Sequence, residues 1–177
     1  MDCTYRDIRF RPEEIEHRYG SSVHILRNPL ALSLLARLGS PEARQPALNG
    51  YVKMLYQTLV DVVINAEFPR KRVSVTSRMA DITPRGVYEA DLIDPDCEAV
   101  SVDIARAGIL PSHICYDRLN HVINADGVRQ DHLVMSRITD KANKVTGAGI
   151  GGSKIGGPIG GRFVLFPDPM GATASSL

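Results

Sequence analysis

The chain lacks several features that would assign it to a broad class of proteins. Its 177 residues contain only three cysteines, Cys3, Cys97 and Cys115, and these include no CxxC pair. An odd, scattered set of this kind is typical of reduced thiols in the cytoplasm rather than of a disulfide framework. We interpret all three as unreactive, partly buried side chains.

Long apolar runs and an excess of charge of either sign are also missing. No run approaches the roughly 20 apolar residues of a membrane-spanning helix, and residues 1–7 lack the apolar region of a signal peptide. A net charge of +1 gives no electrostatic argument for binding nucleic acid or an anionic membrane. The five histidines show no metal-ligand spacing. We therefore expect a cytoplasmic protein without nucleic-acid or membrane partners.

The composition is that of a globular domain with a real core. Hydrophobic residues make up 44% and charged residues 23% of the chain. Residues 1–25 show no clear periodicity, and the chain contains no internal repeats. The patterns change near residue 69, so we expect an N-terminal helical segment over residues 1–68, packed on the core or on a dimer partner, and an α/β core over residues 69–177.

The N-terminal part is expected to be helical. Leucines after Asn28-Pro29 predict a short helix, and Ser40-Pro41-Glu42 combines a cap, an N1 proline and an early acidic residue that would open a second helical stretch. Apolar residues then recur with a period of 3.6 between Leu48 and Val63. This stripe predicts an amphipathic helix over residues 47–67 that packs in the core or in a subunit interface.

From Val73 onward the pattern favours strands. Residues 73–77 and 87–92 alternate around a turn at Pro84-Arg85-Gly86, which predicts a protruding antiparallel pair. Core strands are expected at residues 100–104, 132–137 and 163–166, with a helix at residues 111–123 after the first of them. The strand–helix–strand order predicts a parallel sheet with right-handed crossovers and hence an α/β fold.

A glycine-rich stretch separates the last two core strands. Eight of the fifteen residues from Gly147 to Gly161 are glycine, and Lys154 lies near the centre. We expect a mobile flap that closes over a bound polyphosphate, with an ordinary flexible hairpin or linker as the alternative. The spacing around Lys154 does not match a Walker A phosphate loop.

Three polar residues follow the ends of expected core strands. Arg106, Arg137 and Asp168 should share one rim, because parallel sheets bind ligands at the carboxyl ends of their strands. Two guanidinium groups suit a diphosphate, although either arginine alone could equally be a solvated or structurally paired residue. Asp103 is a candidate to pair with a nearby arginine, and we interpret Asp131-His132 as a surface cluster, with a role in the site as the alternative.

The last fifteen residues are the most informative part of the chain. An apolar strand ends near Asp168, whose carboxylate could accept hydrogen bonds from ribose hydroxyls. Small and hydroxyl residues follow up to Ser176, and such a turn lets backbone N–H groups approach a phosphate closely. The pattern is that of a cradle for a sugar phosphate.

These segments resemble the uracil phosphoribosyltransferase family. The run Asp168-Pro169-Met170-Gly171-Ala172-Thr173-Ala174-Ser175-Ser176 resembles the family's phosphoribosyl-diphosphate loop, Asp-Pro-Met-x-Ala-Thr-Gly-x-Ser, with Ala174 in place of the glycine. Val100–Gly108 resembles its strand ending in Arg-Ala-Gly, and Met135–Asp140 its strand ending in Tyr-Arg-Asp/Asn. The resemblance covers roughly Leu26 to Leu177 and implies an incomplete phosphoribosyltransferase-like parallel-sheet core with the antiparallel β-arm.

The implied reaction transfers phosphoribosyl from phosphoribosyl diphosphate to uracil, giving UMP and diphosphate in pyrimidine salvage. By resemblance, Arg106, Arg137 and Asp168 would be catalytic, and the substrate would be bound by Arg106, Arg137, Asp168, Pro169, Met170, Gly171, Ala172, Thr173, Ala174, Ser175 and Ser176. Mg²⁺ would be chelated by the substrate rather than by dedicated protein ligands. The family also implies a homodimer or a higher homo-oligomer.

Two other functions remain open at this point. The scaffold could be a non-catalytic nucleotide-binding or regulatory module, or an inactive fragment. The family continues beyond the phosphate loop with the segment that recognises uracil, whereas this sequence ends at Leu177. We therefore expect a truncated chain that binds phosphoribosyl diphosphate weakly and forms no UMP by itself.

Overall fold

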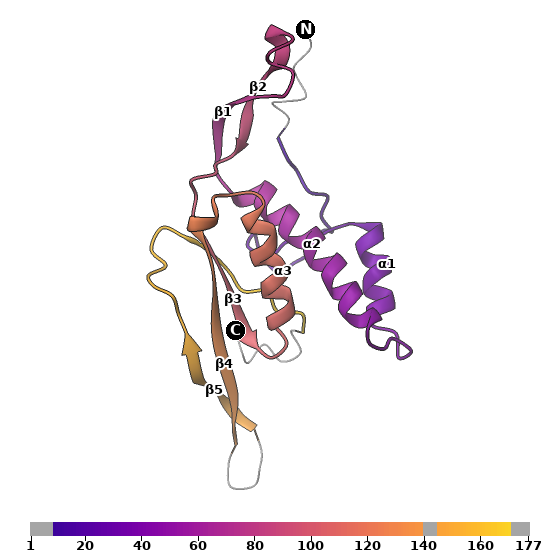
Figure 1. Cartoon of the computed structure of the whole chain (residues 1–177). Helices are drawn as coiled ribbons and strands as arrows, with labels where there is room; N and C mark the ends of the chain where they lie inside the picture. Colours follow the sequence, from indigo (N-terminus) through magenta and orange to yellow (C-terminus); the bar gives the residue numbers. More distant parts are fainter. Residues whose placement is uncertain (1–8, 140–144, 171–177) are drawn as a thin grey trace.

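The computed structural model describes residues 9–139 and 145–170. It has an α/β fold in which helices pack against a mixed sheet and an antiparallel strand pair projects from the body (Figure 1). The elements, in chain order, are α1 (Pro29–Leu38), α2 (Ala47–Glu67), β1 (Arg70–Thr76), β2 (Val87–Ile93), β3 (Ala99–Ala105), α3 (Ile109–Asn120), β4 (Val128–Thr139), β5 (Val145–Lys154) and β6 (Phe163–Leu165), with short 3₁₀ turns at Pro84–Gly86 and Ala125–Gly127. The expected fold class is confirmed.

The main sheet has the strand order β5-β4-β3-β6. Strand β3 is parallel to both β4 and β6, and β5 is antiparallel to β4. The carboxyl ends of β3, β4 and β6 therefore meet at one edge, at the end of the molecule opposite the β1–β2 arm (Figure 1). Any site built from the ends of these strands lies at this edge.

The N-terminal helices follow their local sequence signals closely, with one exception. In α1 the side chain of Asn28 accepts a hydrogen bond from the Ala31 N–H at 3.0 Å, and Pro29 occupies the first helical position. Helix α2 spans the predicted residues 47–67. The helical stretch expected from Ser40 is wrong: the Ser40 hydroxyl accepts from the Glu42 N–H at 3.2 Å within a turn, and the helix begins only at Ala47.

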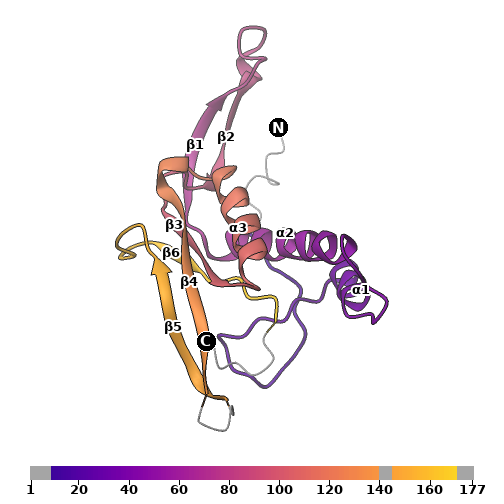
Figure 2. The ribbon, with the colours of Figure 1, turned by 60° about the horizontal axis from the view of Figure 1, so that its bottom comes forward.

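The main core lies between α2, α3 and β3. Figure 2 shows α3 and α2 on one side of the sheet, with β5 at its outer edge. The buried apolar side chains of this cluster come from these three elements, from the residue after α2, from the turn after α3 and from the start of β4, namely Val60, Ile64, Phe68, Ala99, Cys115, Leu119, Ile123 and Val128. Arg118 on α3 also donates two hydrogen bonds of 2.5 Å to the carboxylate of Asp61 on α2. The N-terminal helix and the sheet thus share one core.

The antiparallel arm is confirmed. Strands β1 and β2 pair from Arg70 opposite Ile93 to Thr76 opposite Val87, and the turn at their tip contains Pro84–Gly86. Across the described residues, no helix is both long and apolar enough to cross a membrane.

The glycine-rich stretch differs from the expected loop in its first half. Residues 145–154 form β5, which pairs with β4 from Thr139 opposite Val145 to His132 opposite Lys154. Only the part after Lys154 is a connection without a strand or helix, and it leads into β6.

Candidate functional site

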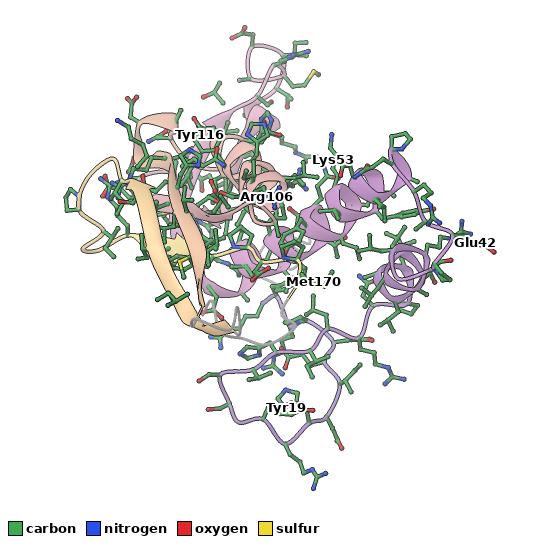
Figure 3. The ribbon with its side chains drawn as sticks, turned by 90° about the horizontal axis from the view of Figure 1, so that it is seen from below. Tyr19, Glu42, Lys53, Arg106, Tyr116 and Met170 are labelled. Carbon is green, nitrogen blue, oxygen red and sulfur yellow. The ribbon has the colours of Figure 1, made fainter. Side chains whose placement is uncertain are left out.

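The structure places the three predicted site residues near one edge of the sheet. Arg106 follows the last residue of β3, and Asp168 comes three residues after β6. Ala105 is level with Val134, so Arg137 lies on the part of β4 that extends about 10 Å beyond the end of β3. Figure 3 looks at this end of the molecule, with Arg106 and Met170 labelled near its centre. The Arg106 side chain is exposed to solvent.

A glycine brings the Arg106 turn against the Asp168 segment. A Cβ atom at Gly108 would lie 2.8 Å from the Ile104 nitrogen, 3.0 Å from the Ile104 oxygen and 3.3 Å from the Pro167 oxygen. All three atoms are backbone atoms, so they cannot swing away as a flexible side chain would. Because the backbone angle φ of Gly108 is −74°, the position requires glycine for space rather than for conformation. The close approach sets the distance between the two segments.

One carboxylate oxygen of Asp168 has a partner among the described residues and the other has none. Its Oδ1 accepts a hydrogen bond from the Met170 N–H at 2.9 Å, which fixes the turn after the strand. Within the described residues its Oδ2 has no partner. Pro169 and Met170 continue the predicted phosphate loop, whereas its remaining predicted residues, Gly171, Ala172, Thr173, Ala174, Ser175 and Ser176, lie outside the described part of the chain.

Tyr56 on α2 lies close to this carboxylate. Burial raises the pKa of the Tyr56 hydroxyl well above its usual range, and nearby Cys115 and Asp168 raise it further. Burial likewise raises the pKa of the Cys115 thiol to about 12. The Tyr56 hydroxyl is therefore neutral over the physiological pH range and can donate a hydrogen bond beside the Asp168 carboxylate.

A mostly apolar cavity opens next to Asp168. Its volume is about 370 Å³, and it lies between α1 and α2. Residues 24–26 and 168–169 also line it. Its polar lining is confined to His24, Tyr56, Thr58 and Asp168.

A pair formed by a buried aspartate and a half-exposed histidine was missed at the level of sequence. Asp103 on β3 is 1% exposed and forms a hydrogen bond through Oδ1 with Nδ1 of His132, its direct neighbour on β4. The expected arginine partner of Asp103 is therefore wrong. The Asp103 Oδ2 atom is buried without a hydrogen-bond partner among the described residues. The alternating pattern of the two strands places both residues on one face, but their register could not be read from the sequence.

Asp131 is likewise no part of a surface cluster. It is 3% exposed and accepts hydrogen bonds from Arg129 Nε at 3.1 Å and from the Gly156 N–H at 3.0 Å. Arg129 also donates to the backbone oxygens of Gly157 at 2.8 Å and Pro158 at 3.0 Å. These bonds hold the connection after β5 against β4, so the expected mobile flap over residues 147–161 is instead a paired strand followed by an anchored turn.

Metal ligands do not gather in the described residues, where no group of three or more His, Cys, Asp or Glu side chains could hold an ion. The peptide bond between Ala105 and Arg106 is cis.

Comparisons with known proteins bear on the fold alone. No protein-family model matches the chain. No curated protein sequence matches it either. The structure is similar to the solved structure of the AQ2163 protein from Aquifex aeolicus, with a TM-score of 0.63 and 18% sequence identity over 85% of this chain. The match covers 64% of the length of the Aquifex protein, so this chain corresponds to somewhat less than two thirds of it.

Proposed function

We propose that this chain is a uracil phosphoribosyltransferase-like enzyme, which transfers phosphoribosyl from phosphoribosyl diphosphate to uracil. The observation that carries the proposal is the close approach, at Gly108, of the Arg106 turn to the Asp168 segment at the carboxyl edge of parallel strands. An arginine and a carboxylate at this edge match two parts of the substrate, its diphosphate and its ribose. Uracil as the acceptor rests on the resemblance of the Asp-Pro-Met segment.

The reaction is a displacement at the anomeric carbon of the ribose. The bond from that carbon to the uracil nitrogen forms while the bond to the diphosphate oxygen breaks, and the nitrogen releases its proton to water. The Oδ2 of Asp168, which has no partner among the described residues, would accept hydrogen bonds from the ribose hydroxyls and hold the ring. The substrate would bind as its Mg²⁺ complex. The exposed guanidinium of Arg106 would then stabilise the negative charge that develops on the diphosphate as it leaves. Arg137 would contribute a second cation from β4.

The test is the formation of UMP from radiolabelled uracil and phosphoribosyl diphosphate with Mg²⁺. The proposal predicts turnover by this chain, whereas the sequence by itself led us to expect none. We expect Arg106→Ala to lower kcat/KM about 10²- to 10³-fold, in the range found when a group that stabilises the transition state is removed. Asp168→Asn should weaken binding of phosphoribosyl diphosphate. Arg78→Ala, which removes an exposed arginine at the distant tip of the arm, is the matched control and should have no effect.

Two results would count against the enzyme. Binding of phosphoribosyl diphosphate without any UMP would favour a non-catalytic nucleotide-binding module. Absence of both binding and turnover would refute the proposal altogether.

A further inference from the structure

The pair of Asp103 and His132 lies on the face of the sheet against which α3 packs. Ser101, two residues before Asp103 on β3, donates from its hydroxyl to the Ser112 oxygen of α3 at 2.9 Å. Alternate residues of a strand point to the same face, so Asp103 and its partner His132 point to this face as well. The His132 side chain is 46% exposed, whereas that of Asp103 is 1% exposed. The pair thus joins a buried carboxylate to a ring that solvent reaches.

The hydrogen bond determines what the ring of His132 offers to a ligand. A carboxylate can only accept, so the proton of this bond is carried by Nδ1 of the histidine. The bond also keeps the ring from turning, as a carboxylate does for histidines in catalytic and metal sites. The other ring nitrogen, Nε2, has no hydrogen-bond partner among the residues that the structure describes. It is therefore the group that the ring presents.

The Asp103 carboxylate lowers the stability of the sheet at this position. Its Oδ2 is buried and has no hydrogen-bond partner in the described part of the chain. Because a buried carboxylate oxygen without a partner is costly, an uncharged side chain would stabilise β3 better here. Such a loss is typical of functional sites, where stability is given up to orient another side chain. The orientation of His132 is the gain that accounts for it.

A lysine lies beside the ring on the neighbouring strand. Lys154 of β5 is directly opposite His132 in the antiparallel ladder, so the two side chains share a face and their Cβ atoms are roughly 5 Å apart. Lys154 is exposed, and no described carboxylate forms an ion pair with it. An ammonium group next to Nε2 repels a metal cation and attracts an anion.

The next row of the sheet leaves room above these two side chains. Toward the carboxyl edge the following residues on this face are Ala105, Val134 and Gly152, which are level with one another across β3, β4 and β5. Val134 is 48% exposed, and a Cβ atom at Gly152 would meet no atom within 4 Å. A ligand can therefore reach His132 and Lys154 from the carboxyl edge.

We propose that His132 and Lys154 bind a phosphate group, and that Asp103 positions the ring for this contact. The lysine ammonium donates to one phosphate oxygen, and a single proton, brought by the ring or by the phosphate, joins Nε2 to another. Asp103 does not contact the ligand, because it is buried on the Nδ1 side of the ring. The site uses no residue of the proposed transferase site and does not depend on that proposal. The phosphate chemistry is the same in phosphoribosyl diphosphate and in any other phosphorylated compound.

The first test follows the ring nitrogens of His132 by heteronuclear NMR of the full chain. Inorganic phosphate is added at constant pH and ionic strength, so that a general salt effect is excluded. We expect the His132 signals to shift with saturation, while the signals of His113, an exposed histidine on α3, stay unchanged. In Asp103→Asn the bond that orients the ring is weaker, so the same shift should require a higher phosphate concentration.

A variant at the exposed position tests the site without touching the buried pair. Lys154→Ala should raise the phosphate concentration for half-saturation of the His132 shift about tenfold or more, the usual loss when a hydrogen bond to a charged group is removed. Lys53→Ala is the matched control, because Lys53 is likewise exposed but lies on α2 (Figure 3), and it should leave the titration unchanged. Unmoved His132 signals, or unchanged binding by Lys154→Ala, would overturn the site.

Phosphoribosyl diphosphate, added without uracil, distinguishes the two sources of the phosphate group. If it shifts the His132 signals and binds Lys154→Ala more weakly, the phosphate belongs to this substrate. If calorimetry shows that it binds while the His132 signals respond to inorganic phosphate alone, the site serves a different phosphorylated ligand. A chain that does not bind phosphoribosyl diphosphate but shows the phosphate shift would refute the proposed function and support this site.

Discussion

At the scale of single residues, Gly108 determines how closely the two halves of the candidate site approach. An added Cβ would overlap the backbone of Ile104 and press on that of Pro167. We expect Gly108→Ala to lower the free energy of unfolding by about 1–3 kcal/mol, the usual range for overpacking. It should also weaken binding of phosphoribosyl diphosphate, because the Arg106 turn is displaced from Asp168. Urea unfolding and calorimetric titration measure the two effects.

The control for this substitution is Gly50→Ala within α2. A Cβ at Gly50 meets no atom within 4 Å. Alanine at a free position inside a helix should raise the free energy of unfolding by roughly 0.5–1 kcal/mol and leave ligand binding unchanged. If Gly108→Ala behaved like Gly50→Ala, the close approach at the site would be refuted.

Tyr56 and Cys115 give the stability a dependence on alkaline pH. The folded state raises both pKa values, so it keeps each proton to a higher pH than the unfolded chain does. Their contribution to the free energy of unfolding is fully present below the pKa values of the unfolded chain, which are about 8.5 for cysteine and 10 for tyrosine. This contribution is lost as the pH rises above those values. Between pH 10 and 11 the free energy of unfolding should fall less steeply for Tyr56→Phe than for the unsubstituted chain. The two decreases should differ by at most about 1 kcal/mol, because Tyr56 is partly exposed. Parallel unfolding curves for the two proteins would contradict this assignment.

At the scale of elements, the Arg129–Asp131 pair anchors the connection between β5 and β6. Arg129→Ala would leave the Asp131 carboxylate buried with the Gly156 N–H as its one remaining donor among the described residues. We expect a loss of about 3 kcal/mol in the free energy of unfolding, typical of a broken buried pair. Hydrogen exchange of the Gly156 amide should become faster.

A double variant separates the pair from the general effect of burial. Arg129→Ala with Asp131→Ala removes the buried charge as well, so part of the lost stability should return. If the double variant is as unstable as the sum of the two single variants, the two side chains do not act together.

How far the sequence predicts these elements depends on whether the signal is local. Helix α2 was predicted with its observed bounds because its apolar stripe repeats over 21 residues. Strands β3 and β4 and helix α3 were also predicted, since the order of apolar runs determines a βαβ unit. Strand β5 was missed because glycine has low strand propensity, and pairing with β4 overrides that preference. The helix expected from Ser40 is absent although its local signal is good, because the capping hydroxyl of Ser40 accepts its hydrogen bond within a turn.

In the candidate site, too, the features with a local signal could be predicted and the others could not. The positions of Arg106 and Asp168 at the carboxyl edge follow from strand order alone. The pairing of Asp103 with His132 requires the register between β3 and β4, which a single sequence does not encode locally. The cavity between α1 and α2 depends on how two helices and a distant segment pack, so nothing in the local pattern pointed to it.

At the scale of the whole molecule, α2 and the sheet are expected to unfold together. Val60 and Ile64 on α2 and Phe68 directly after it are buried in the same cluster as Leu119 of α3. The Phe68 ring also stacks on Phe163 of β6, with ring centroids 4.3 Å apart and an angle of 17° between the planes. Without α2, the apolar surfaces of α3 and β6 would be exposed to water. The N-terminal helix is therefore part of the same cooperative unit as the sheet.

The substitution Ile64→Ala tests this cooperativity. Ile64 is 4% exposed, so its truncation should cost about 2–5 kcal/mol, whereas Val63→Ala at a 38% exposed position on the same helix should cost much less. In a urea titration of Ile64→Ala, the helical circular-dichroism signal and the slowly exchanging amides of β3 should be lost at the same midpoint. If the helical signal disappeared first while the β3 amides stayed protected, α2 would be a separately folding segment and the shared core would contribute little to the stability of the sheet.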